Sequence, residues 1–177
     1  NLLVFFKDKA SVFFSLLSVF IIIGMYALFL GDVWTSGMTD ITGARYLMDS
    51  WIVAGLIAVT SVTTTMGAFG TMVEDQSTKR IKDIRSAPLP RVSIAGGYIL
   101  SSFIIGVIMS VVALVLCELY IVGGGGAALG GAALVKVFGL ILLSTFSNTA
   151  LVLFFVSFFR SNNAFSIAST IIGTVIG

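Results

Sequence analysis

Long apolar stretches separated by short polar segments dominate the pattern along this chain. A helix needs about 20 mostly apolar residues to cross the hydrocarbon core of a bilayer. Four stretches reach this length, and we predict that they form spanning helices at residues 10–30, 51–73, 92–116 and 137–159. A fifth apolar stretch, 164–177, is too short to cross, so we expect its helix to continue beyond Gly177.

The first stretch, 10–30, is predicted to remain in the mature protein. It is longer than the apolar core of a signal peptide, and the following "GDVW" is a poor cleavage site. The segment before it, "NLLVFFKDK", predicts the end of a helix that lies along the membrane surface. Trp51 at the start of the second stretch fits the aromatic belt of a membrane interface.

Composition supports a membrane location for the whole chain. Hydrophobic residues make up 58% of it and charged residues only 10%, whereas charged residues are about 25% of a soluble domain. We therefore predict an all-α, multi-pass membrane protein in which residues 1–177 form a single transmembrane domain. The lipid bilayer is its predicted environment, and a net charge of +2 gives no sign of a nucleic-acid partner.

Basic residues predict the orientation of the spans. Eight of the ten fall on one side of the predicted helices: Lys7, Lys9, Lys79, Arg80, Lys82, Arg85, Arg91 and Arg160. The other two, Arg45 and Lys136, fall on the opposite side. Because loops rich in Lys and Arg stay in the cytoplasm, we predict a cytoplasmic N-terminus in a cell membrane, expected to be a bacterial plasma membrane. The loop 31–49 and the glycine-rich turn near 123–131 are then external.

One short loop, "VEDQSTKRIKDIRSAPLP" at 73–90, carries seven of the eighteen charged side chains. It cannot enter the bilayer, because each charge at the centre costs about 2.5–3.5 kcal/mol. The order of apolar and charged residues in this loop predicts a short helix in which Ile81 and Ile84 share one face. Asp75 or Ser77 is expected to cap the start of this helix, and Pro88 to end it. The loop either sets topology alone or also docks a soluble partner, and the pattern leaves both open.

The same loop resembles a motif of the permeases of type 2 ABC exporters. The matching features are the acidic Glu74 at the end of the second span, Thr78 four residues later, the short helix 79–85 and "APLP" at 87–90. The order of elements along the whole chain is similar as well. Such permeases have six spans and a re-entrant external segment between the fifth and sixth, so the resemblance implies that this sequence covers part of that domain.

The resemblance implies a function and a set of contacts. The chain would be the permease of an ATP-driven exporter, forming a substrate path as a dimer with a second permease copy or a related permease. The cytoplasmic helix would be the coupling helix that sits in a cleft of a separate ABC ATPase subunit. The implied contact residues are Glu74, Thr78, Lys79, Arg80, Ile81, Lys82, Asp83, Ile84, Arg85 and Pro88.

Catalytic chemistry is not expected in this chain. It contains no G-x-x-x-x-G-K-[ST] loop to hold phosphates, so ATP and Mg²⁺ are expected on the partner subunit and no cofactor here. It has no histidine and one cysteine, Cys117, interpreted as a buried packing residue. No ionisable residue falls in the middle of a predicted span, which disfavours an ion-coupled carrier, and Glu118 is interpreted as an interfacial charge. A structural membrane protein or a channel-forming subunit outside the ABC class remains the alternative.

Small and polar residues form faces on the predicted spans. In the third span Ser102, Gly106 and Ser110 recur every four residues, a pattern that favours close helix packing. In the second span four residues lie on one side and could either pack or line a substrate path: Thr60, Thr63, Thr64 and Gly67. Both interpretations stay open, and no residue identifies the substrate.

Overall fold

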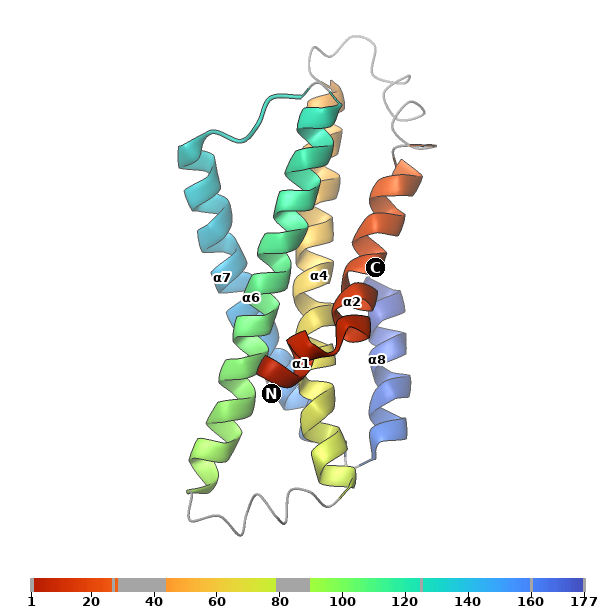
Figure 1. Cartoon of the computed structure of the whole chain (residues 1–177), viewed down its shortest axis with the longest axis vertical. Helices are drawn as coiled ribbons and strands as arrows, with labels where there is room; N and C mark the ends of the chain where they lie inside the picture. Colours follow the sequence, from red (N-terminus) through yellow and green to blue (C-terminus); the bar gives the residue numbers. More distant parts are fainter. Residues whose placement is uncertain are drawn as a thin grey trace.

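The regular structure is helical in the part of the chain that the computed structural model describes, namely residues 2–26, 28, 44–78, 90–124, 126–159 and 161–176. This confirms the predicted all-helical fold (Figure 1). The elements are α1 (Leu2–Lys7), α2 (Lys9–Met25), α4 (Ala44–Ser77), α6 (Arg91–Gly123), α7 (Gly131–Val156) and α8 (Asn162–Ile176).

Three of these helices are long and apolar enough to cross a membrane: Tyr46–Ser77, Val92–Gly123 and Gly131–Val156. They correspond to the predicted second, third and fourth spans. Two shorter apolar helices, Val12–Met25 and Asn162–Ile176, overlap the predicted first and fifth spans. The first predicted span reaches beyond the described residues, so the count of four complete spans stays a prediction.

The bounds of the helices differ from those of the apolar stretches that predicted them. α4 begins at Ala44, so the prediction that a loop continues to Asp49 is wrong. α7 begins at Gly131, six residues before the predicted start, and ends at Val156. Apolar length predicts only the part of a helix that crosses hydrocarbon, whereas good helix formers such as Ala, Arg, Leu and Met in "ARYLM" extend α4 beyond its apolar stretch. With 34 residues, α4 is about 50 Å long, compared with about 30 Å for the hydrocarbon core.

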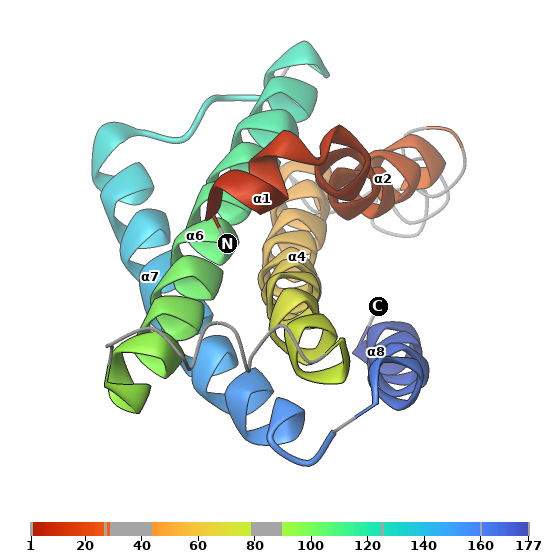
Figure 2. The same ribbon diagram turned by 60° about the horizontal axis from the view of Figure 1, so that its bottom comes forward.

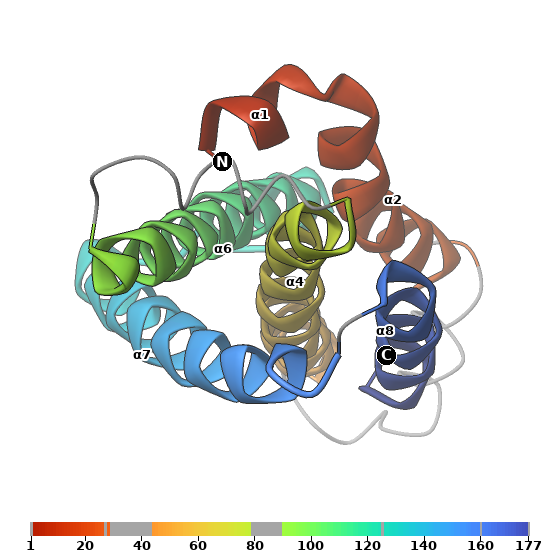
Figure 3. The same ribbon diagram turned by 90° about the horizontal axis from the view of Figure 1, so that it is seen from below.

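α4 stands at the centre of the bundle. In Figures 2 and 3, α6 and α7 lie on one side of it and α2 and α8 on the other, and α4 contacts all four. α6 and α7 cross each other, so α7 diverges from α4 near the top of Figure 1 and α6 diverges near the bottom. The short α1 is a separate helix that crosses α6, and its Phe5 is buried against Ile105 and Met109. Whether α1 lies at a membrane surface stays a prediction.

The three long helices meet at Gly106 of α6. A Cβ atom at Gly106 would lie 2.7 Å from Cγ2 of Thr145 on α7 and 2.8 Å from Oγ1 of Thr65 on α4, so only a hydrogen atom fits there. Ser102 and Ser110, one turn away on either side, are buried too. The predicted packing role of this small-residue face is therefore confirmed.

Hydrogen bonds join the helices beside this junction. The Ser61 and Thr145 hydroxyls of α4 and α7 lie 3.2 Å apart, and Asn148 Nδ2 donates to Ser61 Oγ at 3.0 Å. Such bonds between spanning helices contribute about 0.6–2 kcal/mol each. Ser61, Thr145 and Asn148 thus pair with one another across the contact between α4 and α7.

Apolar clusters fill the bundle on both sides of the junction. One joins α2, α4 and α6 and contains the fully buried Cys117, which confirms the interpretation of Cys117 as a packing residue. Another joins α4, α7 and α8 around Phe69, Val156 and Phe165. The core therefore follows α4 along its length.

We predict that Gly106→Ala destabilises the bundle relative to Gly97→Ala on the same helix. Both changes gain about 1 kcal/mol of helix propensity, but only the first forces a methyl group against Thr145 and Thr65, which costs about 1–3 kcal/mol. A Cβ at Gly97 meets nothing within 4 Å. Thermal unfolding in detergent should give a lower midpoint for Gly106→Ala, and equal midpoints would contradict the close approach.

Candidate functional site

A cavity of about 720 Å³ lies against the C-terminal half of α4, between α1, α2 and α8. We call it the α2–α4–α8 groove. Its wall on α4 is a continuous face of that helix formed by Thr63, Gly67, Thr71 and Glu74. Asn162 and Ser166 of α8 face it from another side, and Ser15 of α2 lines it as well. The groove therefore collects the polar residues of three separate elements beside one face of the central helix.

The four residues predicted as packing or path-lining residues divide into two pairs. Thr63 and Gly67 line the groove. Thr60 and Thr64 are 1% and 0% exposed and pack inside the bundle, where Thr64 Oγ1 donates to Thr60 O at 2.6 Å. The spacing in the sequence could not separate the two pairs. It places the four residues on one broad side of α4, but it does not show which neighbouring element covers each of them.

The groove wall offers acceptors and methyl groups. The Thr63 hydroxyl donates to Val59 O at 3.0 Å and the Thr71 hydroxyl to Ala68 O at 2.9 Å. A hydroxyl that donates to its own helix keeps its oxygen lone pairs for other donors. Asp8 and Glu74 are the charged residues among the described lining, and both are acidic. Nothing in this wall forms a catalytic pair, and within the described ranges no three Cys, Asp or Glu side chains gather to hold a metal.

The end of α4 is closed by its own hydroxyl groups. Thr78 donates to the Glu74 carbonyl through both its backbone N, at 2.9 Å, and its Oγ1, at 2.8 Å. Ser77 Oγ donates to the same carbonyl at 2.9 Å. Two hydroxyl groups therefore add to the ordinary backbone hydrogen bond at this carbonyl in the last turn of α4. Of the implied coupling residues, Glu74 and Thr78 are thus at the helix end, whereas Lys79, Arg80, Ile81, Lys82, Asp83, Ile84, Arg85 and Pro88 lie outside the described residues.

Asp75 joins α4 to α6. It lies inside α4, so the prediction that it caps a new helix is wrong, because α4 continues past Val73 to Ser77. Its Oδ2 accepts a 2.6 Å hydrogen bond from the hydroxyl of Tyr98, which is only 5% exposed. α6 begins at Arg91 after Pro90. The segment 79–89 therefore leaves from and returns to two helices that this bond holds together.

The comparisons with known proteins now bear on these features. A family model for ABC-2 family transporter proteins matches residues 5–177, nearly the whole chain. The chain belongs to this family. Comparison with curated proteins and with solved structures yields no match.

Membership confirms the resemblance found in the sequence. The protein is a membrane permease of the ABC-2 type, and the family implies association with an ABC ATPase subunit. A transport subunit of this kind fits a chain without ATPase motifs. The alternative of a structural or channel-forming protein outside the ABC class is therefore not retained.

We predict that Tyr98→Phe loosens the α4 end of this ABC-2 permease. The change removes the donor to Asp75, and a hydrogen bond to a charged group contributes about 1.5–3 kcal/mol. Amide hydrogen exchange around Glu74–Thr78 should become roughly tenfold faster or more. Tyr120→Phe, which removes a hydroxyl toward the other end of α6, is the control. Unchanged exchange in Tyr98→Phe would show that the bond does not hold the helix ends.

Proposed function

We propose that this chain is the membrane-spanning permease subunit of an ATP-driven exporter, in which the α2–α4–α8 groove is part of the substrate path. The observation that carries the proposal is the continuity of α4. One unbroken helix, Ala44–Ser77, presents Thr63 and Gly67 to the groove and ends one residue before the segment 79–89. Thr78 is the residue between them. A push on that segment from an ATPase subunit would move the groove wall with it.

The proposed path needs a second permease. The groove is flanked by α2 and α8, and both helices expose large apolar side chains, among them Phe13, Phe14, Ile167 and Ile171. A second copy, or a related permease, placed against these helices would close the groove and cover them. Small residues at the contact would allow close approach, and Ser15 and Gly173 are described positions of this kind.

The permease has a defined topology and receives its energy from a partner subunit. The N-terminus and the segment 79–89 lie in the cytoplasm, and four complete spans precede the helix that contains α8. A coupling helix at 78–85 docks in the ATPase subunit, which holds ATP and Mg²⁺, while this chain holds no cofactor. The basic residues on one side of the spans support this orientation.

Accessibility of the groove provides a test that needs no known substrate. In a Cys117→Ala background, Gly67→Cys should react with a polar thiol reagent, because Gly67 is exposed in the groove. Thr64→Cys should stay unlabelled, because Thr64 is fully buried one turn away. ATP added to the complex with its ATPase should change the rate at Gly67→Cys. A rate that never responds to ATP would count against the groove as part of the path.

Docking of the ATPase subunit provides a second test. Ile81→Asp should weaken binding of that subunit. The change loses the burial of an isoleucine side chain, which contributes about 1.5–3 kcal/mol, and it places a charge in the cleft of the ATPase subunit. Lys79→Ala should do much less, because an exposed ion pair contributes only about 0–1 kcal/mol. Membrane insertion should stay normal in both variants.

The topology-only interpretation predicts the reverse order. It makes Ile81→Asp harmless and expects disturbed orientation only when Lys79, Arg80, Lys82 and Arg85 are all changed to Gln. Copurification of the ATPase subunit and protease protection of the loop, measured for all three variants, separate the two interpretations. Wild-type copurification with Ile81→Asp would end the proposal of a coupling helix.

A further inference from the structure

A second cavity, of about 340 Å³, lies between α4, α6 and α7. We call it the α4–α6–α7 pocket. It shares no lining residue with the α2–α4–α8 groove and lies against the N-terminal half of α4, where α7 diverges from α4 and α6 (Figure 1). Protein interiors leave few voids larger than a water molecule, whereas ligand sites have volumes of about 300–1,000 Å³. The pocket is thus large enough to hold a small ligand.

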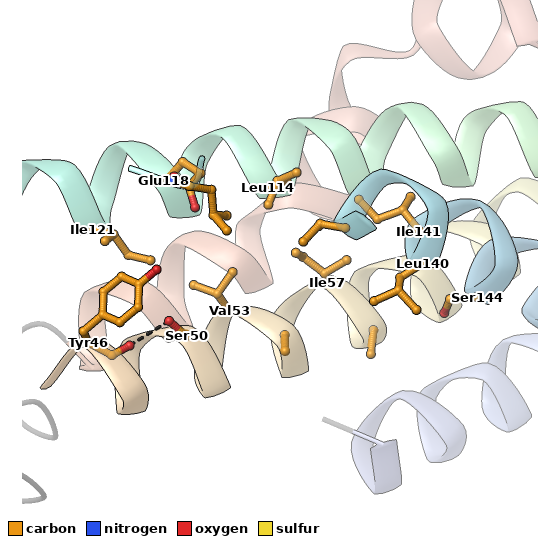
Figure 4. A pocket seen from close by; sticks show the side chains of 14 residues that line it. Tyr46, Ser50, Val53, Ile57, Leu114, Glu118, Ile121, Leu140, Ile141 and Ser144 are labelled. Carbon is orange, nitrogen blue, oxygen red and sulfur yellow. Dashed lines mark hydrogen bonds between the residues drawn. The ribbon is translucent and has the colours of Figure 1, made fainter. Parts of the chain in front are cut away.

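The lining of this pocket changes in polarity from one end to the other. Figure 4 shows the Glu118 carboxylate of α6 and the Tyr46 hydroxyl of α4 directed into the same space at one end. Beyond them the walls are mainly aliphatic, with Ile57, Leu140 and Ile141. Ser144 also lines this far end, where its hydroxyl oxygen accepts a hydrogen bond from Asn148 Nδ2 at 3.4 Å. Ser50 is near the polar end, but its hydroxyl donates to Tyr46 O at 2.7 Å. The pocket therefore matches a ligand with one polar end and a hydrocarbon chain.

Glu118 decides which polar group fits. Of the described residues that line the pocket, it is the only charged one. One carboxylate oxygen accepts a hydrogen bond from Leu129 N at 3.1 Å, which holds the carboxylate in place and brings the linker between α6 and α7 over this end. A carboxylate in a largely apolar surrounding attracts a cation much more strongly than one in water, and it repels an anion equally. An anionic head group is therefore disfavoured.

We propose that the α4–α6–α7 pocket binds an amphiphile that carries an alkylammonium head group. The ammonium group lies at Glu118, with Tyr46 as a second oxygen partner, and the hydrocarbon chain lies between Ile57, Leu140 and Ile141. The site is separate from the proposed substrate path. Its ligand is either the amine of a membrane lipid or a free cationic amphiphile, and these share the recognised chemistry.

The test uses radiolabelled dodecylammonium and the full-length permease, immobilised in an uncharged maltoside detergent. The wild type should bind the probe saturably, and excess dodecanoate should not displace it. Glu118→Gln should weaken binding about tenfold or more, because the charge is lost while an acceptor for Leu129 N remains. Glu74→Gln, which changes an acid of the other cavity, is the matched control and should bind as the wild type does.

A second variant tests the pocket itself. Ala58 lines the cavity, so Ala58→Phe should fill the chain site and abolish binding without touching Glu118. Equal binding by wild type and Glu118→Gln, displacement by dodecanoate, or normal binding in Ala58→Phe would each overturn the proposal. If short-chain phosphatidylethanolamine competes with the probe, the ligand is a membrane lipid. If it does not compete, the ligand is a free cationic amphiphile.

Discussion

The close approach at Gly106 is the constraint on which the arrangement of the long helices depends. Lipid chains are as apolar as leucine side chains, so helices in a bilayer associate through van der Waals packing and hydrogen bonds rather than through removal of apolar surface from water. Both kinds of contact occur together here. The missing side chain at Gly106 lets α6 reach Thr65 and Thr145, and Ser61, Thr145 and Asn148 bond at the same level.

One of the two cavities follows from the helices that cross at this junction. Because α6 and α7 cross, α7 leaves α4 on one side of the junction, and the α4–α6–α7 pocket lies in that opening. The α2–α4–α8 groove lies on another face of α4, toward its C-terminal end, where Glu74 and Thr78 precede the charged segment. The central helix therefore contributes a wall to each cavity. Residues one position apart along it, such as Thr63 and Thr64, belong to different environments.

Apolar length was enough to predict the helical fold and the three long helices of the described residues. Charged side chains are excluded from hydrocarbon, so a spanning helix appears in the sequence as a long stretch without charge. Contacts between helices could not be predicted in the same way. The spacing of Thr60, Thr63, Thr64 and Gly67 predicts a shared side of α4 but does not say which neighbour covers it. The bond between Asp75 and Tyr98 joins residues on two helices with the charged segment between them, and no local pattern indicates the pair.

Glu118 shows the same limit in a single residue. A carboxylate near the end of an apolar stretch is expected to reach toward water. The position of Glu118 along the third predicted span therefore predicts an interfacial charge. In the structure α6 continues for five residues beyond it to Gly123, and the carboxylate turns toward α4 and α7, where Leu129 N satisfies one of its oxygens. The interfacial position of Glu118 stays a prediction, whereas the face of α6 that carries it determines which helices it meets. That face is defined only by where α4 and α7 pack, and their positions follow from the contacts at Gly106.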